Sequence, residues 1–226
     1  MPVLLASFTK KPVITAADSP VYTVHSTTNA SLTLYNELEL EKAGLSQQAF
    51  EAAYKGYVKL VEKDKINNTE YLTICDFSQS SKKKRLYVID IEDKKIVMNT
   101  YVAHGRNSGM EFATKFSNTP ESLQSSLGFY TTKNTYYGEH GLSLRVAGLE
   151  PGFNDKAFDR AIVVHGAEYI GTSRLRNSSY MGRSYGCPAV PAAESASLIN
   201  TIKNGTCLFI YHPTKNYLKG SKILNG

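Results

Sequence analysis

The sequence predicts a mainly β protein with flanking helices, and three observations support this. Short apolar segments rich in β-branched and aromatic residues recur after residue 70, and loops containing Gly, Ser and Asn separate them. A helical pattern precedes these segments. With 226 residues, 42% of them apolar, the chain can bury a sizeable core. We expect an N-terminal tail over 1–29, a helical segment over 30–66 that packs on the main domain, and the main domain over 67–226.

The clearest helix of the N-terminal part begins after Ser46. Apolar side chains recur there at the spacing of one helix face, at residues 50, 53, 54, 57, 58 and 61. Ser46 is a typical N-cap residue. Leu45 before it and Phe50 after it are spaced to form a hydrophobic staple. The opening residues 1–7 have the apolar character of a secretion-signal remnant but lack a basic start and a full apolar core, so they do not demonstrate export.

The remaining elements follow from the apolar runs and the turn residues between them. The expected strands are 71–77, 86–91, 96–103, 127–132, 142–147, 161–165 and 206–211. The charged connector 92–95 predicts an antiparallel hairpin. A helix is expected over 192–203, with Gly205 just past its end. The long loops over 105–126 and 167–186 are typical of functional segments.

The charge of the chain favours an anionic partner. The formal net charge is +6 and the pI is near 9.0. The densest basic run, 82–85, lies between two strand-like segments without any module that reads a nucleic-acid groove, so we interpret it as a solvated turn. An acidic wall polymer therefore ranks above nucleic acid, which we do not expect to bind. No apolar run reaches the length of a membrane span.

The three cysteines differ in their surroundings. Cys75 and Cys207 lie in apolar, strand-like runs and are interpreted as inert core thiols. Cys187 lies among Gly, Pro, Ser and Arg residues, a loop composition in which a thiol can be exposed and reactive. Because the number is odd, at least one thiol stays free or pairs with another chain.

His165 and Cys187 have the residue types of a nucleophile and its base. His165 ends a buried strand and Gly166 follows it, while Cys187 lies in a glycine-rich turn that Pro188 stiffens. A thiol needs a nearby base to become a thiolate at neutral pH. The backbone N–H groups of Tyr185, Gly186 and Cys187 are the nearest candidates for an oxyanion hole. A histidine at a sheet edge and a cysteine filling a loop would have the same composition.

The pattern His-Gly, an 18-residue gap and Ser-x-Gly-Cys resembles the signature of YkuD-type L,D-transpeptidases. The similarity is greatest to the murein L,D-transpeptidase catalytic domain branch and covers about residues 70–212. The segments that carry it are Arg85-Leu86-Tyr87-Val88, His104-Gly105-Arg106-Asn107-Ser108-Gly109, Phe116-Ser117-Asn118, Ser125-Ser126-Leu127-Gly128, His140-Gly141-Leu142-Ser143-Leu144 and Gly182-Arg183-Ser184-Tyr185-Gly186-Cys187-Pro188-Ala189-Val190.

This resemblance implies a β-sandwich-like catalytic fold and a ping-pong acyl transfer without a cofactor. Cys187 would attack the carbonyl of the third stem-peptide residue and release D-alanine. An amine of a second stem would then form a 3→3 cross-link, or water would give L,D-carboxypeptidase activity. The carbonyl of Gly166 would orient His165. Carbapenems, which acylate the family's cysteine, are the expected inhibitors, and the cell envelope is the expected location, periplasmic or secreted.

The chain departs from the commoner family pattern at two positions. Tyr185 stands where a second histidine is usual, and Ala189 stands where Arg or Asn would be. The second change leaves the donor carboxylate without its usual partner, and Arg183 is our candidate for that task. Ser184, His104 and His140 complete the expected substrate-binding residues.

Three alternatives compete with this interpretation. His104, His140, His165 and Cys187 could together form a zinc site, but their spacings match no compact zinc-ligand pair, and we predict no metal. A thiol hydrolase of another class of peptide and a wall-binding module without activity would share the fold. The presence of both Cys187 and His165 argues against the inactive module.

Overall fold

In this computed structural model, residues 24–176 and 178–226 are described. Their helices are α1 Val24–Glu37, α2 Leu40–Ala43, α3 Gln47–Glu62, α4 Thr172–Arg176, α5 Ala192–Ile202, α6 Lys215–Gly220 and α7 Lys222–Asn225. Their strands are β1 Tyr71–Asp76, β2 Leu86–Asp90, β3 Lys95–Thr100, β4 Gly128–Gly138, β5 Gly141–Gly148, β6 Val163–Ala167, β7 Ala189–Pro191 and β8 Cys207–Tyr211. The predicted signal remnant lies outside the described residues.

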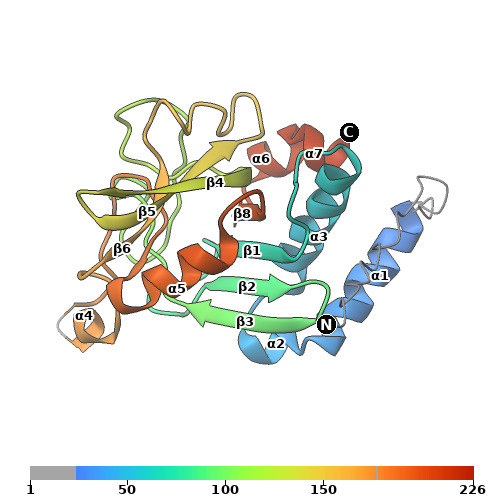
Figure 1. The fold of residues 1–226 in the computed structure, drawn as a ribbon, viewed down its shortest axis with the longest axis horizontal. Coiled ribbons are helices and arrows are strands. Elements are labelled where there is room, and N and C mark those ends of the chain that lie inside the picture. Colours follow the sequence, from blue (N-terminus) through green and yellow to red (C-terminus); the bar gives the residue numbers. More distant parts are fainter. Residues whose placement is uncertain (1–23, 177) are drawn as a thin grey trace, which may run out of the picture.

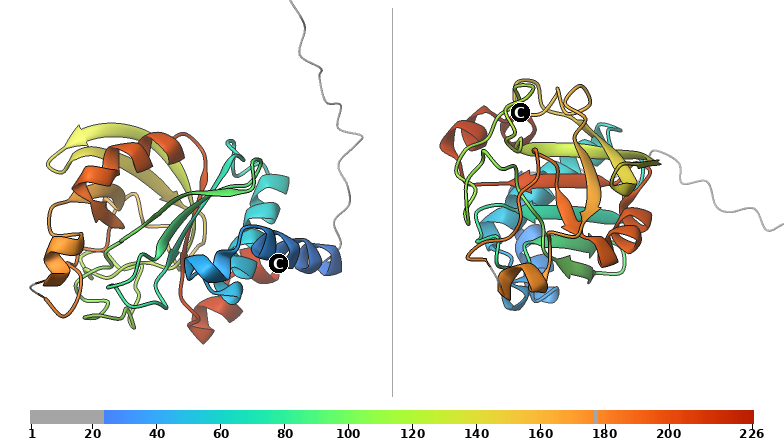
Figure 2. Two further views of the ribbon diagram at one scale, coloured as in Figure 1. Left: turned by 90° about the horizontal axis from the view of Figure 1, so that it is seen from below. Right: turned by 90° about the vertical axis from the view of Figure 1, so that its left-hand side faces the viewer.

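The strands form one mixed sheet in the order β3-β2-β1-β8-β4-β5-β6-β7. Most neighbours are antiparallel, but β1 pairs with β8 and β6 pairs with β7 in parallel. The sheet curves strongly (Figure 2). Its ends meet where the segment after β3 reaches β7, since the Ala103 N–H donates to the Ala189 carbonyl at 2.8 Å. The prediction of a mainly β fold with flanking helices is confirmed, and the strands form a single sheet that nearly closes on itself.

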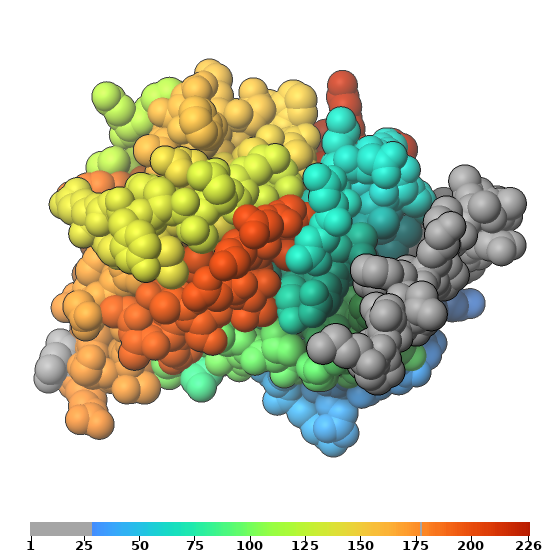
Figure 3. Space-filling view, viewed as in Figure 1, coloured from blue at the N-terminus to red at the C-terminus, as the bar shows by residue number. Residues whose placement is uncertain are grey.

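Most helices gather at one end of the sheet. The first three helices, with α6 and α7, lie at the end opposite α4 (Figure 1). The α5 helix packs across β5, β6 and β7. In the space-filling view it lies directly below β4 and covers this face of the molecule (Figure 3). The two C-terminal helices were not predicted from the sequence. Tyr217 and Ser221 attach them to the sheet through hydrogen bonds to the buried carboxylate of Glu150.

The α3 helix joins the helical segment to the sheet. Ser46 caps it, accepting a hydrogen bond from the Ala49 N–H at 3.2 Å, and Leu45 and Phe50 are both fully buried, as predicted. Gly56 lies in the middle of α3, where glycine costs about 1 kcal/mol relative to alanine. A Cβ atom there would lie 2.0 Å from the Phe129 ring. The glycine therefore lets this helix approach β4 closely.

The start of the first helix, the C-terminal helices and one turn are among the features that differ from the sequence prediction. The α1 helix begins at Val24, before the predicted start at residue 30. Two short helices follow β8, where none was predicted. The run 82–85 is only partly a solvated turn: its three lysines are exposed, but Arg85 is fully buried. The Asp76 N–H donates to the Arg85 carbonyl just before β2, and the Arg85 guanidinium donates to the carbonyls of Gln79 and Val102.

Candidate active site

The turn that carries Cys187 is held by Ser184 and Gly186. The Ser184 Oγ accepts from the Gly186 N–H at 3.1 Å and donates to the Cys187 carbonyl at 2.6 Å. Gly186 has a φ of +127°, and a Cβ atom there would lie 2.8 Å from the Gln124 carbonyl oxygen. Both strain and space thus require glycine at this position. Ser184 is buried, so it holds the turn and does not face a substrate.

The thiol of Cys187 lies at the start of strand β6. Its Sγ is 3.8 Å from the Ala161 carbonyl oxygen, and the Val163 N–H donates to it. Pairing of β6 with β7 begins only at His165 and Ala189, so this earlier part of β6 faces the Cys187 segment instead. Burial raises the pKa of the thiol, while the Val163 N–H and the Arg160 guanidinium lower it.

The ring of His165 is oriented by one backbone carbonyl. Its Nδ1 lies 2.9 Å from the Gly166 oxygen, and a carbonyl can only accept. Nδ1 therefore carries the hydrogen, and Nε2 keeps a lone pair that can accept a proton. Burial lowers the pKa of His165, with the Gly166 carbonyl acting in the opposite direction. The imidazole is consequently neutral at physiological pH, as a base must be.

His140 covers His165 from the tip of the β4–β5 hairpin. The two rings stack with centroids 4.2 Å apart and an interplanar angle of 18°. The β5–β6 pairing of Ser143 with His165 places the hairpin tip beside the strand end. His140 is exposed, so it can contact both solvent and His165.

His104 lies in the protein core, apart from the stacked pair of His140 and His165. Its side chain is fully buried, with Nδ1 2.8 Å from the Arg85 Nη2 and Nε2 3.4 Å from the Gly109 carbonyl oxygen. Burial, and after it the positive charge of Arg85, lowers the pKa of His104 to about 3. The expectation that His104 binds substrate is corrected: both ring nitrogens are engaged, and the ring supports the turn over 105–109.

Arg160 is a functional candidate that the sequence reasoning missed. Its guanidinium donates to the carbonyls of Ser117 and Gln124 at 2.8 and 2.6 Å, which holds the long loop over 105–126 against the Cys187 turn. It also carries a positive charge close to the thiol, because Cys187 raises the pKa of Arg160 and Arg160 lowers that of Cys187. No motif marks Arg160, since its contacts come from segments distant in sequence.

The three predicted oxyanion donors are not equivalent. The Gly186 N–H is already bonded to Ser184, so it is not available to a substrate. The N–H of Tyr185 makes no hydrogen bond to any group within residues 24–176 and 178–226. The N–H of Cys187 lies near its own sulfur and lowers the pKa of the thiol. The turn thus presents the N–H groups of Tyr185 and Cys187.

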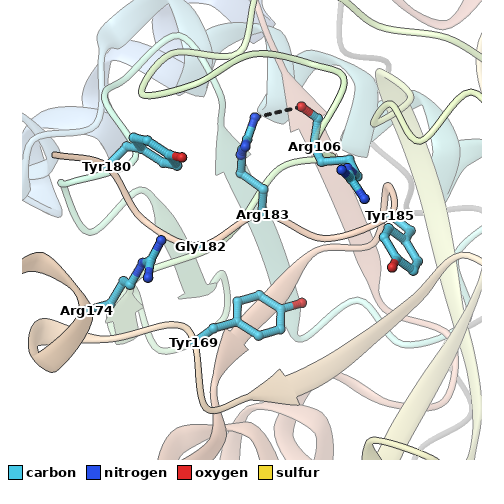
Figure 4. Close-up of a pocket in the computed structure, with 7 residues that line it drawn as sticks. All are labelled: Arg106, Tyr169, Arg174, Tyr180, Gly182, Arg183 and Tyr185. Carbon is cyan, nitrogen blue, oxygen red and sulfur yellow. Dashed lines mark hydrogen bonds between the residues drawn. The ribbon is translucent and has the colours of Figure 1, made fainter. Parts of the chain in front are cut away.

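An open pocket of about 330 Å³ lies beside this turn (Figure 4). We call it the arginine pocket, because it is lined by Arg106, Arg174, Arg183, Tyr169, Tyr180 and Tyr185. Arg183 donates through Nη1 to the carbonyls of Arg106 and Gly109 at 2.9 and 3.1 Å. Gly182 completes the wall, where a Cβ atom would lie 2.3 Å from the Tyr169 ring. Arg183 therefore lies at the pocket, and its role as a carboxylate partner stays a prediction.

The structure places Cys75 and Cys207 in the core, as predicted. Cys75 and Cys207 are free and fully buried, and burial raises the pKa of Cys75 to about 12. Among the described residues, no three His, Cys, Asp or Glu side chains are arranged to hold a metal ion.

None of the helices in the described ranges is long and apolar enough to cross a membrane.

One family model matches most of this chain. A family model described as the L,D-transpeptidase catalytic domain matches residues 41–211, including α3 and the whole sheet. An L,D-transpeptidase from Mycobacterium smegmatis is 14% identical, with a TM-score of 0.39 over 63% of this chain and 59% of that one. The helical cell shape determining protein Pgp2 from Campylobacter jejuni is 17% identical, with a TM-score of 0.41 over 71% and 57%.

Another similar structure is an L,D-transpeptidase from Xylanimonas cellulosilytica, which is 18% identical, with a TM-score of 0.35 over 62% of this chain and 59% of that one. The chain thus spans less than two thirds of each of these three structures. A search of curated proteins gave no match.

Proposed function

Because the chain belongs to the L,D-transpeptidase catalytic domain family, we propose that it is a cysteine acyltransferase acting on peptidoglycan stem peptides. Cys187 is the nucleophile and His165 is the base. The observation that carries this proposal is the arrangement along β6. The sulfur contacts the backbone at Ala161 and Val163, and His165 follows two residues later with its Nε2 free to accept a proton.

The pKa directions describe a neutral resting pair. Burial raises the pKa of Cys187 and lowers that of His165, so a thiol and an imidazole are both uncharged before substrate arrives. Proton transfer then accompanies attack. The Sγ–H proton passes to His165 Nε2 while sulfur bonds to the carbonyl carbon of the third stem residue, and the carbonyl oxygen takes the negative charge.

Collapse of this intermediate completes the acylation. The N–H groups of Tyr185 and Cys187 stabilise the oxyanion. When the carbon–nitrogen bond breaks, His165 returns its proton to the leaving amine of D-alanine, and a thioester on Cys187 remains. An amine of a second stem attacks that thioester and yields a 3→3 cross-link, with the thiolate reprotonated through His165. Attack by water instead releases the tripeptide, which is L,D-carboxypeptidase activity.

The surrounding residues have supporting roles in this proposal. Gly166 fixes the tautomer of His165, Ser184 fixes the turn, and Arg183 binds a carboxylate of the donor peptide. His140 closes the site over His165 and meets the substrate from the hairpin tip. A substrate of the wall places the protein in the cell envelope, in the periplasm or outside the cell.

Intact-mass spectrometry after incubation with a carbapenem tests the nucleophile. The strained lactam carbonyl would acylate Cys187 and add the inhibitor mass once. Cys187→Ala should show no adduct, whereas Cys75→Ala should retain it, because Cys75 is fully buried. Absence of an adduct on the wild type, or its persistence in Cys187→Ala, would refute the assignment. Incubation with a stem tetrapeptide then distinguishes dimer from tripeptide product, and no product at all would favour a wall-binding module.

A further inference from the structure

The arginine pocket has positive charges without carboxylate partners. None of the ion pairs within the described ranges includes Arg106, Arg174 or Arg183, and all of those pairs use lysine. The Nη1 of Arg183 is occupied by two carbonyls, but its Nη2 makes no hydrogen bond to the described part of the chain. Three guanidinium groups at one opening repel each other, and this arrangement favours a bound anion.

The three arginines come from separate segments that the fold brings together. The Arg106 N–H donates to the Ser184 carbonyl at 2.7 Å, which places it next to Arg183. Its guanidinium lies 5.9 Å from the centre of the Tyr185 ring. Arg174 is exposed on α4 and reaches the pocket from the side opposite Arg106, and Tyr169 lies between Arg174 and Tyr185 (Figure 4). A ligand in the pocket can therefore meet guanidinium groups at two places.

The pocket lies near the turn that carries the thiol. Tyr185 lines the pocket and lies two residues before Cys187. Tyr169 also lines it, and both Cys187 and Tyr185 raise the pKa of its phenol, which places that ring within electrostatic range of the sulfur. A volume of about 330 Å³ is at the lower end of small-molecule sites, roughly 300–1,000 Å³. It suits a short peptide segment and not a folded polymer.

We propose that the arginine pocket binds the donor stem peptide through at least two of its free carboxylates and so selects for acidic stem peptides. The placement of the peptide rests on the function proposed above. Guanidinium groups match carboxylates in a planar, two-bonded geometry, and the tyrosine rings stack on Arg106 and Arg183 and hold them in place.

Calorimetric titration of the Cys187→Ala protein tests this without turnover. The probes are a stem tetrapeptide with diaminopimelate at the third position and the same peptide with every carboxylate amidated. We expect the acidic peptide to bind at least about tenfold more tightly, and Arg174→Gln to remove most of that difference. Arg176→Gln is the matched control, because Arg176 lies on the same helix, is exposed and does not line the pocket.

Equal affinity for the two peptides would overturn the proposal, and so would an unchanged preference in both Arg174→Gln and Arg106→Gln. Added sodium chloride should weaken binding of the acidic peptide only. The carbapenem adduct on wild-type protein reports separately on the function of Cys187. If the adduct forms but the peptides bind equally, the pocket assignment fails and the nucleophile assignment stands.

Discussion

Two regions of this protein contain the same three residue types, and only one of them is the proposed active site. One consists of Cys75, Arg85 and His104, and the other of Cys187, Arg160 and His165. In both, the arginine lowers the pKa of the nearby cysteine while burial raises it. We call the first the core triplet. Arg85 in the core triplet is fully buried and donates to the carbonyls of Gln79 and Val102.

The difference lies in which atoms remain unbonded. In the core triplet both ring nitrogens of the histidine have protein partners, and the thiol is sealed from solvent. At the candidate site, His165 uses only Nδ1, and Cys187 is partly exposed. Residue type and pKa shift alone would not separate the two regions. A histidine with one ring nitrogen unbonded and a partly exposed thiol do.

Replacing His165 by glutamine should lower activity, whereas replacing His104 by glutamine should lower stability. His165→Gln removes the proton acceptor, so kcat/KM for cross-linking should fall by roughly 10²–10⁴-fold with little loss of stability. His104→Gln breaks the contacts to Arg85 and Gly109 and should cost about 1–3 kcal/mol in the free energy of unfolding. Steady-state kinetics and urea denaturation check both. Equal loss of activity and stability in the two variants would remove the distinction.

Removal of the buried cation should mainly affect stability. Arg85→Met fills the same space but leaves the Gln79 and Val102 carbonyls without their donor, so the unfolding free energy should fall by about 3 kcal/mol. Lys84→Met is the control next to it, and since Lys84 is exposed we expect a change within about 0.5 kcal/mol. If both variants are equally stable, the buried arginine is not a structural element.

The corresponding change at the candidate site should affect reactivity. Arg160→Gln removes the cation that lowers the pKa of Cys187, so the iodoacetamide alkylation rate at neutral pH should fall by about three- to tenfold. Arg160→Lys should restore part of the rate, because it keeps the charge. Lys156→Gln, an exposed neighbour, should leave the rate unchanged. A normal rate in Arg160→Gln would mean that the guanidinium only holds the loop.

The sequence predicted what depends on local pattern and missed what depends on long-range contact. The short apolar runs predicted seven of the strands, and the motif around Cys187 predicted the turn and Gly186. β7 is only three residues long and pairs with both His165 and Ala103, so no pattern could mark it. The buried His104 contacts Arg85. Three lysines precede Arg85 in the sequence, a pattern that predicts a solvated residue.

The pH dependence of kcat/KM should report on His165, and we expect a small effect. Burial lowers the pKa of His165, so its neutral, active form persists below the usual value of about 6.5. An unshifted histidine would lose about threefold in kcat/KM between pH 7 and 6, and we expect a smaller loss here. A pH–rate profile measures this, and an acid limb at or above pH 6.5 would contradict it.

Protonation of His104 should change the free energy of unfolding and not the reaction rate. Its folded pKa of about 3 lies below the unfolded value of about 6.5, so between these pH values the unfolded chain binds the extra proton. The stabilising effect is complete above pH 6.5 and declines as the pH falls toward 3, with a limiting slope of about 1.4 kcal/mol per pH unit. Urea denaturation at a series of pH values should show this slope in the wild type and lose that part of it in His104→Gln. The same direction of pKa shift would then have two meanings, a catalytic one at His165, where a ring nitrogen is free, and a purely structural one at His104, where none is.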